Sequence, residues 1–276
     1  MRGSLVVLWL LVASVAHAQP KPIGLFGVTC DVPAWASFGQ LADWDDFEAA
    51  ADCSQRTGLR WVLALHHGDT GHVRRIRAKV ERSGLAPYVL ALTYREEPYQ
   101  HYFFGLDLPP ALRSALDDQP DADPYARIRL VRDHWSAAHA TIKAVWPGPL
   151  VAWITPFVND YEGYGPLWYA PLPDGVDVLV LDPYASDAQS FTGWPEIAIQ
   201  HAVNTTTLPI AIVPQWFAAP GTAFSRQRVD FVDAYARWYA HPRVVAFWGF
   251  LWGSRATTLG LQDLPALRAA VEARIP

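Results

Sequence analysis

Short apolar segments alternate with helical segments along this 276-residue chain. The apolar segments are rich in Val, Leu and Ile and end in polar or turn-forming residues, which is typical of strands buried on both faces of a parallel sheet. Strict alternation of strands and helices predicts parallel strands joined by right-handed crossovers. We expect seven strands, over residues 23–29, 59–65, 88–93, 150–155, 176–181, 209–213 and 244–250.

One more strand would complete a (β/α)8 barrel. We expect it as a short strand between Pro33 and Leu41, or else the barrel is incomplete. The competing architecture, a doubly wound open sheet, usually carries a glycine-rich phosphate turn after its first strand, where this chain has Cys30-Asp-Val-Pro33. We therefore predict an α/β fold, a TIM-type (β/α)8 barrel with one short or irregular strand, as a single domain over residues 19–276.

Helical patterns fill the intervals between the strands. Gly58 is expected to end the first helix, and Asp123 is expected to cap the helix over 125–145. The segment 99–123 has no helical pattern, and we expect an irregular loop there. The helices are expected over residues 45–57, 72–83, 125–145, 196–203, 226–239 and 264–274.

The first eighteen residues have the pattern of a secretory signal peptide. Arg2 supplies a positive charge, residues 5–13 are apolar, and Ala16-His17-Ala18 is a small-x-small cleavage site. The apolar stretch is shorter than a membrane span, and no later segment approaches one. We therefore expect a secreted or periplasmic protein with no stable membrane span after cleavage, and an uncleaved anchor is the alternative.

The net charge of -5 and the lack of a basic cluster argue against a nucleic-acid partner. We find no motif for a cofactor or a metal, so we expect neither, and we expect a monomer. The two cysteines are Cys30 and Cys53. Export would permit a disulfide between them, and two buried thiols are the alternative.

Polar and aromatic residues stand where the expected strands end. The carboxyl ends of parallel strands form the rim at which ligands bind, so these residues are candidates for a site. Aromatic rings at a polar rim suit sugars, whose C–H faces stack on the rings while the hydroxyl groups form hydrogen bonds nearby. The candidates for substrate binding are Asp31, His66, Tyr94, Asn159, Asp160, Tyr184, Gln215, Trp216, Trp248 and Trp252.

Two adjacent carboxylates, Glu96 and Glu97, follow the third expected strand and precede Pro98. Alternate side chains along a strand face opposite ways, so only one of the pair is expected to face a ligand. We favour Glu97 as a general acid, because a neighbouring carboxylate and aromatic neighbours would raise its pKa toward the protonated form. An exposed loop carboxylate or a salt bridge to Arg95 is the alternative.

Glycoside hydrolysis needs a protonated acid at the departing oxygen and a carboxylate that attacks the sugar or activates water. Asp182 is the candidate for this second carboxylate, and Glu96 is a further catalytic candidate. For Asp182, a turn-capping role before Pro183 is an equal alternative.

Several of these strand ends resemble those of glycoside hydrolase barrels, broadly of clan A. They are Tyr94-Arg-Glu-Glu-Pro98, Asp182-Pro-Tyr184, Pro214-Gln-Trp216 and the tryptophan-rich last strand. The resemblance implies an acid/base glutamate after the fourth strand, where Glu97 stands if the last strand is the eighth. It also implies a nucleophile glutamate after the seventh strand, where this chain has Gln215.

The departure at Gln215 leaves three alternatives. Asp182, Asp31 or Asp160 supplies the second carboxylate, or a more distant base gives inversion, or the protein binds glycans without cleaving them. The leading expectation is an exported glycoside hydrolase acting on a poly- or oligosaccharide. Platforms for its sugar rings are expected at Trp216, Trp248 and Trp252.

A metal-dependent hydrolase built from Asp31, His66, His67 and Asp182 is a competing hypothesis. Adjacent histidines on a strand face opposite ways, and neither a His-x-His nor a His-Glu-x-x-His pattern occurs. Serine-based catalysis lacks its Gly-x-Ser-x-Gly turn. We therefore rank both below the carboxylate mechanism.

Overall fold

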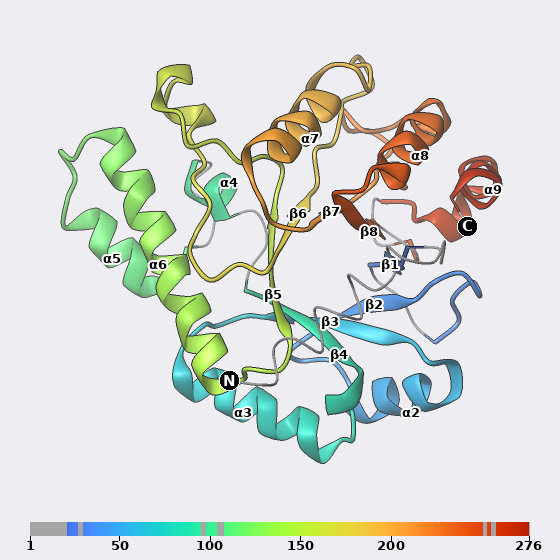
Figure 1. Cartoon of the computed structure of the whole chain (residues 1–276), viewed down its shortest axis with the longest axis horizontal. Coiled ribbons are helices and arrows are strands. Elements are labelled where there is room, and N and C mark those ends of the chain that lie inside the picture. The colour runs from blue at the N-terminus through green and yellow to red at the C-terminus, as the bar shows by residue number, and fades with distance from the viewer. Residues whose placement is uncertain are drawn as a thin grey trace.

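The sheet is a closed barrel of eight strands, in a computed structural model that describes residues 21–26, 30–94, 98–103, 108–250, 253–254 and 258–275. Each strand pairs in parallel with the next, and β8 closes the ring by pairing with β1. Helices lie around the outside of the strands (Figure 1). The predicted (β/α)8 fold is therefore confirmed. The strands are β1 Ile23–Leu25, β2 Phe38–Ala42, β3 Arg60–Leu65, β4 Val89–Tyr94, β5 Leu150–Thr155, β6 Val178–Leu181, β7 Ile210–Ile212 and β8 Val244–Gly249.

The short strand β2 is the one whose position was open in the sequence. Its residue Phe38 pairs with Gly24 of β1 on one side and with Arg60 of β3 on the other. Phe38 packs inside the barrel, whereas Leu41 packs against the helices. With β2 in place, the strand before Glu96 and Glu97 is the fourth and the tryptophan-rich strand is the eighth, as predicted.

Local signals begin and end several helices as expected. Asp123 caps α6, because its Oδ2 accepts a hydrogen bond from the Ala126 N–H at 3.1 Å. Gly58 ends α2 with a φ of 75°, a left-handed conformation that favours glycine. The helices of the described residues include α2 Phe47–Thr57, α3 Thr70–Arg82, α4 Pro98–Phe103, α5 Pro110–Asp117, α6 Pro124–Val145, α7 Trp194–Thr205, α8 Val232–Ala240 and α9 Pro265–Arg274.

Two expectations about the helical layer are wrong. The segment 99–123 is not an irregular loop, because it contains most of α4 and all of α5. Leu112 and Leu116, four residues apart, are both buried on one face of α5 and account for this helix. α8 begins at Val232 rather than near residue 226, because Arg228 adopts a non-helical ψ of 56°.

Strand residues alternate between two apolar cores. Val180 and Trp248, for example, pack inside the barrel. Their neighbours Leu179 and Phe247 pack between the strands and the helices. The alternation therefore identifies which side chain at each strand end continues the inward-facing row.

A disulfide joins Cys30 and Cys53, with Cα atoms 5.6 Å apart, and ties the segment after β1 to α2. Of the two alternatives for the cysteines, the disulfide is therefore the one that the structure contains. Across the described residues, we find no helix with the length and apolar character of a membrane span. The expected signal peptide, residues 1–18, lies outside the described residues.

Candidate functional site

Asp182 directly follows β6 at the carboxyl end of the barrel. Val180 packs inside the barrel and Leu181 packs against the helices, so Asp182 continues the inward-facing row. Its side chain is buried, with 6% exposed, and its backbone N–H donates to the Thr155 carbonyl at 3.2 Å. Asp182 is thus a buried carboxylate at the inner edge of the rim on which the catalytic groups of (β/α)8 enzymes lie.

Gln215 lies three residues after β7, next to the loop that Asp182 begins. Its Oε1 accepts a hydrogen bond from the Ala185 N–H at 3.0 Å, which fixes the orientation of the amide. Its backbone N–H donates to the hydroxyl of Tyr235 on α8 at 3.2 Å, and burial raises the pKa of Tyr235. The Nε2 of Gln215 is buried and has no hydrogen-bond partner among the described residues. Gln215 therefore presents a buried donor at the position where the resemblance to clan A barrels implies a carboxylate.

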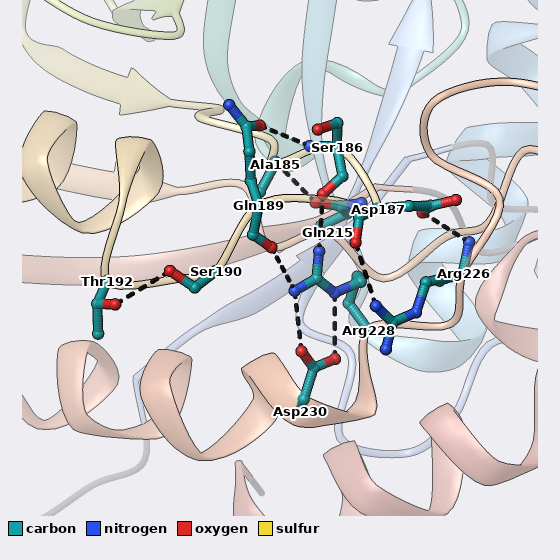
Figure 2. A network of polar contacts seen from close by, with 10 residues as sticks. All are labelled: Ala185, Ser186, Asp187, Gln189, Ser190, Thr192, Gln215, Arg226, Arg228 and Asp230. Atoms are coloured by element: carbon teal, nitrogen blue, oxygen red, sulfur yellow. Dashed lines mark hydrogen bonds and ion pairs between the residues drawn. The ribbon is translucent and has the colours of Figure 1, made fainter.

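A buried arginine ties the loop after β6 to the loop after β7 (Figure 2). The guanidinium of Arg228, 2% exposed, donates to the carbonyls of Ser186 at 3.0 Å and Gln189 at 2.9 Å. It also donates to both carboxylate oxygens of Asp230, at 3.1 and 2.8 Å. Since Ser186 and Gln189 follow Asp182 on one loop, Arg228 holds that loop against the segment that follows Gln215.

Asp187 forms a second tie between the same two loops. Its carboxylate accepts hydrogen bonds from the backbone N–H of Ser225 at 3.1 Å and of Arg226 at 2.9 Å, and from the Ser225 hydroxyl. The hydrogen bond from the Ser225 hydroxyl lowers the pKa of Asp187, and the one from Arg228 lowers the pKa of Asp230. Both carboxylates thus stay ionised and keep the loops joined at neutral pH.

Aromatic side chains fill the inner mouth on the side of β6, β7 and β8. The Tyr184 ring lies 5.0 Å from Phe217, and Phe217 lies 5.3 Å from Phe250, between ring centroids. Below them, Trp248 stacks on Phe26 at 4.6 Å. Among the predicted aromatic residues that the structure describes, Tyr184 is the one that reaches this mouth, and it is half-buried.

The expected sugar platforms Trp216 and Trp248 are buried, with 1% and 2% exposed. The Trp216 ring covers Gly249, where any larger residue would collide with it, and lies 6.2 Å from Phe247. Stacking on a sugar needs an open ring face, and neither ring offers one. Both tryptophans belong to the apolar core: Trp216 packs in the layer between the strands and the helices, and Trp248 packs inside the barrel.

Tyr94 and Asn159 also have structural contacts. Tyr94 packs outside the barrel on Trp135, whose Nε1 donates to the Tyr94 carbonyl at 3.1 Å. The Asn159 amide bonds within its own loop, donating to the carbonyls of Tyr161 at 3.1 Å and Trp168 at 2.6 Å. These two side chains therefore serve helix packing and loop closure.

The other predicted site residues divide into two groups. The exposed residues on the carboxyl side of the barrel are Asp31, His66 and Asp160. The residues that lie outside the described part of the chain are Glu96, Glu97 and Trp252. Of the predicted set, Asp182 and Tyr184 lie on the loop after β6, and Gln215 is hydrogen-bonded to the same loop through the Ala185 N–H.

Sequence reasoning missed a polar cluster at the ends of β2 and β3. Asp43, which is buried, accepts hydrogen bonds from the His66 backbone N–H at 2.7 Å and from His72 Nε2 at 2.6 Å. Trp44, the next residue, is 68% exposed, and its ring lies 5.6 Å from His66. The run Leu41-Ala42-Asp43-Trp44 carried this signal, but it could be used only once β2 was known to end at Ala42.

Within the described ranges, no three His, Cys, Asp or Glu side chains are grouped so that they could hold a metal ion. The structure of these residues therefore gives no support to the metal-dependent hydrolase built on Asp31, His66, His67 and Asp182. What the rim does offer is a buried carboxylate, an amide donor and aromatic rings. Such a set can bind and protonate or deprotonate a hydroxylated ligand.

No protein-family model matches the chain, and comparison with curated protein sequences gives no match. Solved structures match it in fold. A calcium-binding mutant of Bacteroides uniformis β-glucuronidase 2 superposes with a TM-score of 0.54 at 12% identity, over 89% of this chain and 33% of its own. A Prevotella bryantii endo-β-mannanase/endo-β-glucanase gives 0.50 at 12%, over 92% and 48%. The Ostrinia furnacalis group IV chitinase gives 0.50 at 8%, over 91% and 100%.

The chain spans only 26–33% of the length of the β-glucuronidases that it matches. At identities this low, the likeness concerns the fold, and the activities printed for these proteins remain theirs. The resemblance of the chain to glycoside hydrolase barrels is confirmed at this level: it has the (β/α)8 barrel on which such enzymes are built.

Proposed function

We propose that this protein is an exported glycoside hydrolase that acts on a poly- or oligosaccharide. In this proposal Glu97, after the fourth strand, is the general acid, and Asp182 is the second carboxylate. Residues 1–18 direct export to the periplasm or the medium, and residues 19–276 form the single catalytic domain.

The observation that carries the proposal is the inward-facing, buried Asp182 at the carboxyl end of a closed (β/α)8 barrel. Catalytic groups of such barrels come from the ends of different strands on this face. Glu97 follows β4, and Asp182 follows β6, so the two come from different strands of one rim. The aromatic mouth beside Asp182 and the hydrogen-bonding amide of Gln215 suit a hydroxylated ring.

The test is release of reducing sugar from a panel of bacterial and plant polysaccharides. Glu97→Gln and Asp182→Asn should each lower turnover by at least about a hundredfold, the usual contribution of a positioned acid or base. The matched control variants are Glu81→Gln and Asp52→Asn, which change exposed helix carboxylates and should leave turnover unchanged. Wild-type turnover that survives both rim substitutions would refute the assigned roles.

A glycan-binding barrel without catalysis is the second candidate. It is favoured by Gln215, whose buried amide is held by the Ala185 N–H where the clan's nucleophile glutamate would stand. In that case the protein would bind oligosaccharides with no turnover, and Glu97→Gln would bind as tightly as the wild type. Binding measured alongside turnover therefore separates the two functions.

A further inference from the structure

Trp44 is an exposed aromatic residue at the β2–β3 side of the barrel mouth. It stands in the connection between β2 and α2, on the carboxyl face of the barrel, and 68% of it is exposed. Because most of its apolar surface stays in contact with water, the indole contributes little of the burial free energy that a core tryptophan would contribute. A ligand that stacks on it would offset that cost.

The backbone on both sides of Trp44 is pinned. The Asp43 N–H donates to the Ala64 carbonyl at 3.1 Å, and the Asp45 N–H donates to the Ala42 carbonyl at 3.1 Å. In return, the Asp45 carboxylate accepts from the Ala42 N–H at 2.7 Å. Trp44 therefore sits in a closed turn, so an incoming ligand would order little backbone.

The Asp46 and Lys79 side chains extend this support. Asp46 caps α2 by accepting from the Ala49 N–H at 3.0 Å, and Lys79 Nζ donates to the Asp45 carbonyl at 3.2 Å. The start of α2 is thereby fixed directly after the exposed ring. The turn that carries the exposed ring is therefore held on both sides, and a fixed backbone suits a preformed platform for a ligand.

The backbone of His66, whose ring contacts the Trp44 indole, is held by Asp43, and Asp43 is in turn held by His72. Arg75 Nη2 lies 2.8 Å from His72 Nδ1, and a guanidinium can only donate, so Nδ1 is the acceptor and the hydrogen of His72 is on Nε2. That Nε2–H donates to Asp43 at 2.6 Å, and the same carboxylate oxygen accepts the His66 N–H at 2.7 Å. The buried Asp43–His72 pair thus fixes the end of β3 that carries the exposed His66 ring.

We propose that Trp44 and His66 form a subsite for one pyranose ring of a glycan, with Asp43 and His72 as positioning residues. The sugar stacks its C–H face on the indole, and the adjacent imidazole hydrogen-bonds a hydroxyl group at the ring edge. This inference rests on the proposed glycan-directed function and adds the part of the mouth, across the barrel from Asp182, that extends the bound chain.

The experiment compares the wild type with Trp44→Ala, Trp44→Phe and Trp168→Ala. Cellohexaose, mannohexaose, xylohexaose and chitohexaose are the probes, with dissociation constants from calorimetry in the Glu97→Gln background and KM and kcat from the active protein. Trp44→Ala should weaken binding or raise KM about tenfold or more with kcat little changed, the loss typical of a buried aromatic contact. Trp44→Phe, which keeps an aromatic ring, should retain most of the wild-type affinity. Trp168, a rim tryptophan 48% exposed in the loop after β5, is the matched control and should have no such effect.

The outcomes separate the inference from the function on which it rests. If the wild type binds a hexasaccharide and Trp44→Ala binds it equally well, the subsite is refuted and the proposed function stands. An equal loss in Trp168→Ala would also refute it, because the effect would not be local to Trp44. If the wild type neither binds nor cleaves any of the four probes or the polysaccharide panel, the proposed function fails and the subsite with it.

Discussion

Replacing Arg228 by Met should lower the unfolding free energy of the protein, because it breaks the hydrogen bonds that join the loop after Asp182 to the segment after Gln215. The substitution removes four hydrogen bonds from a charged group and leaves the carbonyls of Ser186 and Gln189 without their donor. Hydrogen bonds to a charged group contribute about 1.5–3 kcal/mol each when buried. The carbonyls lie on residues that are half-buried or exposed, and Asp230 is 51% exposed, so water replaces part of the loss.

The expected cost is therefore about 2–4 kcal/mol of unfolding free energy, below the sum of the four bonds and near the 3–5 kcal/mol of a broken buried pair. That corresponds to a change of about 30-fold to 1,000-fold in the folding equilibrium constant, at 1.4 kcal/mol for each tenfold. Arg228→Lys keeps the charge but not the planar fork, so it should lose about half as much.

The assay is urea unfolding followed by tryptophan fluorescence, with the unfolding free energy taken by linear extrapolation. Arg226→Met is the matched control, because Arg226 is exposed and donates from its side chain to the Asp187 carbonyl at 3.1 Å. An exposed contact of this kind should cost no more than about 0.5 kcal/mol. The reasoning fails if Arg228→Met costs less than 1 kcal/mol, or if Arg226→Met costs as much.

Two further stability predictions follow from single groups. The disulfide between Cys30 and Cys53 closes a loop with a sequence separation of 23, so reduction should lower the unfolding free energy by about 3 kcal/mol, and Cys30→Ser should make urea unfolding insensitive to dithiothreitol. Burial lowers the pKa of His139 to about 4, so the unfolded chain takes up a proton that the folded one does not. Stability should therefore be full above pH 6.5 and fall by up to about 3 kcal/mol as the pH drops from 6.5 to 4. His139→Leu should lack this decline, and an identical pH profile would contradict the assignment.

Much of the fold could be predicted from local pattern. The apolar segments, their alternation with helices and the capping residues Asp123 and Gly58 each depend on neighbours a few residues apart, which the sequence displays directly. Counting back from the last strand placed Glu97 after the fourth, and the barrel confirms that order. The short strand β2 could only be bracketed, since five residues carry little periodic signal.

The site was harder to predict because a strand end does not reveal what lies above it. Trp216 and Trp248 follow the rim pattern in sequence, yet neighbouring layers bury both. Asn159 likewise looks like a ligand-binding amide but closes its own loop. In each case the partner that decides the role is fixed by folding rather than by adjacency in the chain.

The sequence by itself determined the architecture of this protein: parallel strands in strict alternation with helices, and carboxylates, amides and aromatic residues at the strand ends. Only the tertiary structure decided which of those residues face a ligand. Closure of the barrel set Asp182 inward, joined Asp43 to His72 across 29 positions, and buried Arg228 between two loops. The physical reason is that burial and hydrogen bonding at the rim arise from contacts between distant segments, which no local pattern encodes.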